Sequence, residues 1–152
     1  RHRRGYVMAQ AGIDQSNIPS DGDDPQVLLL PEDPDGSAAR LRAGIGRRTG
    51  VYPHVIVSDS WGRPFRRGVV GFALGTAGFL PLLSRIGEQD LYGRALQVTE
   101  IAQADQLAAA ASFLLGEAAE GSPAVIIRGA VLAASDEGSG ALLRAVEDDL
   151  FR

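Results

Sequence analysis

An apolar run with a glycine at every third or fourth position constrains the fold of this chain more than any other feature. Residues 68–78 read Gly-Val-Val-Gly-Phe-Ala-Leu-Gly-Thr-Ala-Gly. So many glycines would undermine a helix in water, whereas a strand tolerates them where another backbone or a ligand comes close. The run therefore predicts a strand that closely approaches a ligand or another strand.

Strands and helices alternate only loosely around this run. The apolar, β-branched residues 51–57 give the strongest strand signal in the chain. Further short strands are predicted at residues 6–10, 27–30 and 124–129. Helices are predicted at residues 38–49, 99–115 and 142–151. No glycine-rich nucleotide fingerprint joins a strand to a helix, so we predict an α+β fold with a mixed sheet and packed helices, without a P-loop or Rossmann fingerprint.

Composition excludes several classes of function. A length of 152 residues fits one domain, residues 1–152, with its own core. The formal charge of -4 argues against a nucleic-acid partner, and no apolar run approaches the length of a membrane span. We therefore expect a cytoplasmic protein. All 15 basic residues are arginine and there is no cysteine, which excludes a lysine-based P-loop, disulfides and zinc thiolates.

Two polar loops, residues 11–17 and 58–68, each follow a predicted strand and carry an aspartate beside a hydroxyl or an amide. Asp14 and Asp59 could bind a divalent cation, because Mg²⁺ and Mn²⁺ prefer oxygen ligands. Ser60 could bind a second ion and Asn17 a nucleotide. The alternative is that all four are turn residues that bond the local backbone. The residue types leave both interpretations open.

Three other charged positions are candidates for binding a ligand. Arg63 and Arg66 follow the second loop, and their guanidinium groups match the geometry of phosphate, so they are candidate substrate or phosphate ligands. Glu117 follows a predicted helix, where a carboxylate is electrostatically unfavourable unless a cation is near. The alternatives are a solvated hairpin edge for the arginines and a solvated turn for the glutamate.

Two further features favour structural roles. His54 lies inside the apolar run 51–57, which favours a core or edge histidine over a general base. Asp90 and Arg94 are four residues apart, the spacing of a structural ion pair. Without a second well-placed histidine or a nucleophile-elbow pattern, Ser-His-Asp chemistry is not predicted.

Six segments occur in a characteristic order: residues 11–17 (AGIDQSN), 34–38 (PDGSA), 58–66 (SDSWGRPFR), 90–94 (DLYGR), 104–108 (ADQLA) and 127–129 (IRG). Together they resemble the coenzyme F420:L-glutamate ligase family, and six ordered matches are more specific than any one motif. The resemblance implies an α+β homodimer unlike the common nucleotide-binding folds. It also implies that residues 1–152 are the larger C-terminal part of the ligase domain, inactive without its N-terminal region.

The resemblance implies GTP-dependent addition of L-glutamate to coenzyme F420-0 through an acyl phosphate, followed by γ-linked glutamates. On the matching positions, Asp14 and Asp59 would bind one divalent cation, Mg²⁺ or Mn²⁺, and Ser60 a second, while Asn17 would contact GTP. Glu117 falls where the family often has glutamine near the metal and GTP. A monovalent cation is a further candidate cofactor.

Two other classes of function fit the residues. One is a non-catalytic, metal-dependent module that binds a nucleotide or another anion. The other is a structural dimerisation domain in which both aspartate loops are ordinary turns. The distance between the two loops in the folded chain separates these hypotheses.

Overall fold

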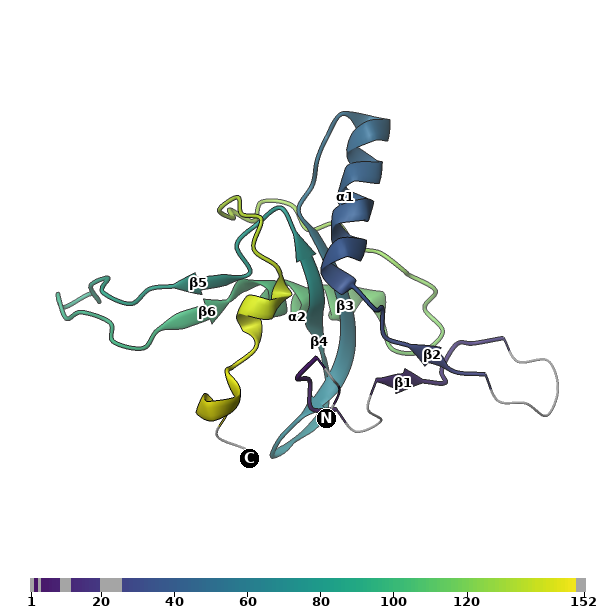
Figure 1. The fold of residues 1–152 in the computed structure, drawn as a ribbon, viewed down its shortest axis with the longest axis horizontal. Coiled ribbons are helices and arrows are strands. Elements are labelled where there is room, and N and C mark those ends of the chain that lie inside the picture. The colour runs from purple at the N-terminus through teal and green to yellow at the C-terminus, as the bar shows by residue number, and fades with distance from the viewer. Residues whose placement is uncertain (1, 3, 9–11, 20–25, 150–152) are drawn as a thin grey trace.

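A long antiparallel hairpin lies at the centre of the computed structural model, which describes residues 2, 4–8, 12–19 and 26–149 (Figure 1). The hairpin consists of β3 (Val55–Arg63) and β4 (Arg66–Ala77). Helices α1 (Pro34–Thr49) and α2 (Gln103–Leu115) pack against it. Two shorter antiparallel pairs extend to either side: β1 (Ile13–Asp14) with β2 (Leu28–Leu29), and β5 (Leu82–Ser84) with β6 (Glu100–Ala102). The predicted α+β class is confirmed.

The glycines of β4 allow both helices to approach the hairpin closely. A Cβ atom added to Gly71 would lie 2.5 Å from the carbonyl oxygen of Ala108 in α2. A Cβ atom on Gly75 would overlap the backbone of Pro34, the first residue of α1. The predicted glycine-bearing strand is therefore confirmed, and at these two positions the close neighbours are helices rather than another strand.

Local signals at both ends fix the length of α1. The side chain of Asp33 accepts a hydrogen bond from the backbone N–H of Gly36 at 3.0 Å, and Pro34 occupies the first turn. At the other end, Gly50 adopts a φ of 74° and donates its N–H to the carbonyl of Gly46. The predicted stop is confirmed, and the helix begins about one turn earlier than predicted.

One carboxylate oxygen connects three elements that are far apart in the sequence. Asp35 Oδ1, in the first turn of α1, accepts hydrogen bonds from the backbone N–H of Thr76 at 2.8 Å and of Ser139 at 2.9 Å. Ser139 opens the 3₁₀ turn η1 (Ser139–Leu142), and its hydroxyl donates to the carbonyl of Leu74 at 2.7 Å. Asp35 thus ties α1 to the end of β4 and to the C-terminal part of the chain.

The hydrophobic core is small for a chain of this length. The buried hydrophobic residues of the described chain are Tyr6, Ala38, Ala73, Leu74, Ala77, Phe79, Ala104 and Ala108. One cluster among them joins Ala73, Phe79 and Ala104 to the partly buried Ile56, Leu107, Leu132 and Leu142. The accessible surface is 11016 Å², whereas a compact 16.0 kDa monomer would expose roughly 7400 Å². Much of the chain therefore remains open to solvent. No helix among the described residues is long and apolar enough to cross a membrane.

The hairpin differs from the prediction in where its first strand lies. β3 begins at Val55, four residues later than predicted, and continues to Arg63. Asp59 and Ser60 therefore lie inside the strand, opposite Phe72 and Gly71, instead of in a loop beyond it. Cross-strand pairing with β4 is the physical reason, because it holds polar residues extended that would otherwise form a turn.

Tertiary pairing also changes the start of α2. The helix was predicted from Thr99, but residues 100–102 pair with β5 as strand β6, so the helix begins at Gln103. Its predicted end at Leu115, before Gly116, is confirmed. The predicted strand 27–30 is confirmed in part, as β2.

Three other predictions are wrong for the described residues. Residues 124–129 form no strand, because no neighbouring strand among the described residues pairs with them, and Ile126 is 78% exposed. Residues 6–8 form no strand, and the remainder of that predicted strand, 9–10, lies outside the described residues. The helix predicted at residues 142–151 is absent from the described residues, because Leu143 is extended after η1 and only the short turn η2 (Val146–Asp148) follows. Residues 150–151 lie outside the described residues.

Burial destabilises the ionised form of one carboxyl group at the helix–hairpin contact. Asp105, in the first turn of α2, accepts a hydrogen bond from the backbone N–H of Ala73 at 3.0 Å. Burial raises the pKa of the Asp105 carboxyl above its ordinary 3.8, and this effect exceeds the lowering by the hydrogen bond. The protonated form is therefore favoured by folding.

We predict that Asp35→Ala lowers the free energy of unfolding by about 2–4 kcal/mol, because two backbone N–H groups lose their acceptor. Asp35→Asn keeps an oxygen at the same place, so its free energy of unfolding should fall by clearly less. Urea denaturation of the three proteins measures the difference. An alanine variant as stable as wild type would show that this oxygen does not hold the elements together.

We predict that Asp105→Asn becomes increasingly stabilising as the pH rises. The raised pKa means that Asp105 contributes stability at low pH, which is lost as the pH increases through the folded-state pKa. Asparagine keeps an acceptor for Ala73 and does not ionise. The difference in Tm between variant and wild type should therefore grow from acidic to neutral pH, and a difference that shrinks over that range would contradict this explanation.

Candidate functional site

A cavity of about 1040 Å³ lies beside the central hairpin and is lined by four segments of the chain. Its walls come mainly from residues 12–17 around β1, residues 28–31 around β2, residues 57–62 of β3 and residues 115–123 after α2. Five of the predicted site residues line it: Asp14, Asn17, Asp59, Ser60 and Glu117. The volume suits a ligand of nucleotide size.

A direct hydrogen bond joins two of the predicted ligands. The hydroxyl of Ser60 donates to Oε2 of Glu117 at 2.7 Å, although the two residues are 57 positions apart. Ser60 is held by its pairing in β3, and Glu117 follows Gly116, which ends α2 with a φ of 79°. The turn after α2 thus brings a carboxylate onto the wall of β3.

Asp59 is half-buried next to this pair. Its Oδ1 accepts the backbone N–H of Ser60 at 2.8 Å. Burial raises the pKa of the Asp59 carboxyl, the hydrogen bond from Ser60 opposes this, and the charges of Asp14 and Glu117 raise the pKa further. The negative charges of Asp14 and Glu117 therefore both disfavour ionisation of Asp59, and a bound cation would counteract this effect.

Asp14 also stabilises a local turn. Its Oδ1 accepts the backbone N–H of Ser16 at 2.8 Å and the hydroxyl of Ser16 at 2.7 Å, and these bonds lower the pKa of its carboxyl. Asn17 has a φ of 53°, in the left-handed region that asparagine tolerates well. Asp14 therefore fits both interpretations, because it caps a turn and also lines the cavity.

The oxygen atoms that line the cavity are of the type that Mg²⁺ prefers, but the protein alone would supply only some of the ligands of such an ion. Within the described part of the chain, no three histidine, cysteine or acidic side chains are grouped closely enough to hold a metal by themselves. Mg²⁺ commonly binds through one or two carboxylates and completes its octahedron with phosphate and water oxygens. Asp14, Asp59, Glu117 and the hydroxyl of Ser60 line the cavity and carry oxygen atoms of the type that such a cation prefers.

The two predicted phosphate-binding arginines lie at the turn between β3 and β4 and do not line the cavity. Arg63 follows Trp61 and Gly62, which are lining residues. Its Nη2 donates to the carbonyl of Arg67 at 3.3 Å, and its Nη1 is buried without a hydrogen-bond partner among the described residues. Arg66 is exposed. The structure therefore places the two arginines beyond the cavity, at the end of the same hairpin.

The sequence interpretation missed Trp61 as a residue of the site. Its ring stacks on Phe72 with centroids 4.3 Å apart, and the side chain lines the cavity. The available signal was the position of the only tryptophan of the chain within an otherwise polar segment. The strand pairing that orders this segment was not visible in the pattern.

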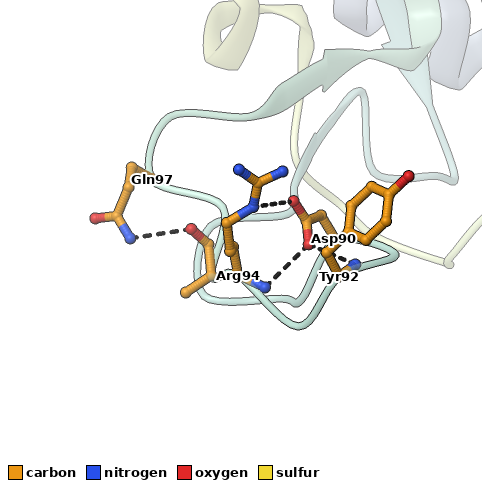
Figure 2. Close-up of polar contacts among 5 residues, drawn as sticks. Asp90, Tyr92, Arg94 and Gln97 are labelled. Atoms are coloured by element: carbon orange, nitrogen blue, oxygen red, sulfur yellow. Dashed lines mark hydrogen bonds and ion pairs between the residues drawn. The ribbon is translucent and has the colours of Figure 1, made fainter.

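The predicted ion pair is confirmed in a turn between β5 and β6, where Figure 2 shows its hydrogen bonds. Arg94 Nε lies 3.0 Å from Asp90 Oδ2, and Asp90 Oδ1 accepts the backbone N–H groups of Tyr92 and Arg94. His54 is exposed, with its ring 5.5 Å from that of Phe79, and it does not line the cavity. The ion pair has the structural role predicted for it, whereas the prediction for His54 is wrong, because this residue is exposed and precedes β3 instead of lying inside the strand.

Comparison with known proteins shows to which family this chain belongs. The family model described as F420-0:Gamma-glutamyl ligase matches residues 1–129. The chain belongs to the F420-0:gamma-glutamyl ligase family. The predicted resemblance is thereby confirmed.

Curated relatives within the F420-0:gamma-glutamyl ligase family match nearly the whole chain. The coenzyme F420:L-glutamate ligase of Methanothermobacter thermautotrophicus is 52% identical over 152 residues, covering 99% of this chain and 59% of that protein. The corresponding ligase of Methanocaldococcus jannaschii is 47% identical over 150 residues, and that of Archaeoglobus fulgidus 47% over 149 residues. These matches cover 99% and 97% of this chain, and 58% and 57% of the relatives. The chain thus spans less than two thirds of the length of these ligases.

Proposed function

We propose that this chain forms the cation- and nucleotide-binding part of a GTP-dependent ligase that adds L-glutamate to coenzyme F420-0. Relatives named coenzyme F420:L-glutamate ligase support the substrates. The observation that carries the proposal is the convergence of Asp14, Asn17, Asp59, Ser60 and Glu117, from three chain segments, onto one cavity.

The chemistry requires a site for concentrated negative charge. A carboxylate of F420-0 attacks the γ-phosphate of GTP and releases GDP, and the amine of L-glutamate then displaces phosphate from the acyl phosphate. Further glutamates would be added through γ linkages in the same way. Divalent cations, Mg²⁺ or Mn²⁺, would neutralise the phosphate oxygens during the first transfer.

Each polar residue of the cavity has a separate role in this proposal. Asp14 and Asp59 hold one divalent cation, and Ser60 and Glu117 hold a second. The Ser60–Glu117 hydrogen bond, at 2.7 Å, supports the pairing of the latter two. Asn17, on the loop after β1, contacts the nucleotide.

Glu117 makes this site more acidic than one with glutamine at the same position. Its charge acts on Asp59 together with that of Asp14. The excess negative charge strengthens the requirement for bound cations, and it provides a physical reason for a monovalent cation beside the divalent ones.

A homodimer is part of the same proposal. The accessible surface of 11016 Å² exceeds the roughly 7400 Å² of a compact monomer of this mass. Large apolar side chains contribute to the excess, with Leu91 98% and Val131 96% exposed. Contact with a second copy would bury part of this surface.

We predict that Asp59→Asn in the full-length protein lowers the production of GDP and of glutamylated F420-0 by about 100-fold or more, because the neutral amide binds the cation poorly. The assay contains GTP, Mn²⁺, L-glutamate and F420-0. Asp136→Asn, an exposed acid outside the cavity, is the matched control and should retain full activity.

Two outcomes would contradict the proposal. Undiminished turnover by Asp59→Asn would remove that carboxylate from the cation site. A wild-type protein that binds GTP and Mn²⁺ but forms no product would favour a non-catalytic nucleotide-binding module. Circular dichroism of each variant confirms that the comparison concerns folded protein.

A further inference from the structure

The turn between β3 and β4 holds a large aromatic side chain in a conformation that favours glycine. Arg63 pairs with Arg66, so Pro64 and Phe65 alone form the loop. Phe65 has a φ of 60°, in the left-handed region that non-glycine residues rarely adopt, and it is 95% exposed. Glycine would make the same turn without strain or exposed apolar surface. Backbone strain of the kind found at Phe65 is typical of functional sites.

Three arginines flank this aromatic residue in the sequence, and none of them forms an ion pair within the described part of the chain. Arg63, Arg66 and Arg67 lie within five positions, and residues 60–87 contain no aspartate or glutamate. The ion pairs in the described part of the chain involve Arg85 and Arg94 instead. Arg63 Nη1 is buried and has no hydrogen-bond partner among the described residues, which is costly unless a ligand supplies an acceptor.

The turn is continuous with the cavity. Trp61 and Gly62 line the cavity and directly precede Arg63 on β3. Asp59 and Arg63 are four residues apart, which corresponds to about 13 Å along an extended strand. A long ligand whose reacting end lies at Asp59 and Ser60 would therefore reach the turn with its other end.

We propose that the β3–β4 turn is the binding site for the acceptor substrate: Arg63, Arg66 and Arg67 bind its anionic chain, and Phe65 contacts its flat heteroaromatic ring. This inference rests on the proposed function, in which the acceptor is a deazaflavin whose carboxylate reacts in the cavity. GTP is assigned to the cation ligands and to Asn17, on a different segment of the cavity wall. The guanidinium groups match anionic oxygens, and an aromatic face matches a planar ring.

The test uses two variants of the full-length protein, Phe65→Gly and Arg66→Ala. Each should raise the KM for F420-0 by about 10-fold or more and leave the KM for GTP within about 2-fold. Isothermal titration with F420-0 alone should show the same loss of affinity. Phe65→Gly should keep or raise the Tm, because glycine adopts the positive φ without strain.

Control variants distinguish a specific effect of the β3–β4 turn from the general effect of removing any exposed aromatic or cationic side chain. Phe113→Ala removes a side chain of α2 that is 89% exposed, and Arg144→Ala removes an exposed cation near the C-terminus. Both controls should bind F420-0 as tightly as wild type does. Equal losses in the controls and in the turn variants would overturn the assignment.

The two measurements also separate this inference from the proposed function. If wild type binds F420-0 and the turn variants do not, the inference holds even where no glutamylated product forms, and only the proposed function fails. If wild type forms product and the turn variants keep its KM for F420-0, the inference is overturned and the function stands. A rise in the KM for GTP alone, or a loss of dimers with unchanged F420-0 binding, would also overturn it.

Discussion

The hydrogen bonds of one carboxylate oxygen hold this fold together. Asp35 Oδ1 accepts two backbone N–H groups, from the end of β4 and from η1, 41 and 104 residues further along the chain. The hydrophobic core is small, so few apolar contacts connect the same elements. The described core cluster contains only three fully buried members. The geometry of β4 between its two helices therefore depends on polar anchoring as well as on the close contacts at Gly71 and Gly75.

This anchoring reaches the cavity through Leu74. The carbonyl of Leu74 accepts the hydroxyls of Ser139 and Tyr6, and its side chain lines the cavity. β4 in turn holds β3 in register, so that Asp59 lies opposite Phe72 and Ser60 opposite Gly71. The hairpin thus positions Asp59 and Ser60, while Asp14 and Asn17 come from the segment around β1 and Glu117 from the turn after α2. Chemistry that requires fixed ligand geometry depends on holding these three segments together.

Local patterns in the sequence predicted the features that depend on short-range chemistry. The end of α1 at Gly50, the glycine-bearing strand β4 and the Asp90–Arg94 pair are examples. Features that depend on residues far away in the sequence could not be predicted. β3 keeps Asp59 and Ser60 extended because β4 pairs with it, whereas residues 124–129 lack such a partner strand in the described chain. The cavity residues were predicted from their ordered motifs, whereas Trp61 and the backbone of Phe65 became visible only in the folded chain.

In the proposed function, Asp14, Asp59, Ser60 and Glu117 form one binding site for cations and phosphate. Crystals of the full-length protein grown with Mn²⁺ and GDP would test it most directly through the anomalous scattering of manganese. We expect one Mn²⁺ peak within about 2.0–2.6 Å of the carboxylates of Asp14 and Asp59, and a second beside Ser60 and Glu117. Manganese and nucleotide bound elsewhere, with these four side chains free of both, would contradict it.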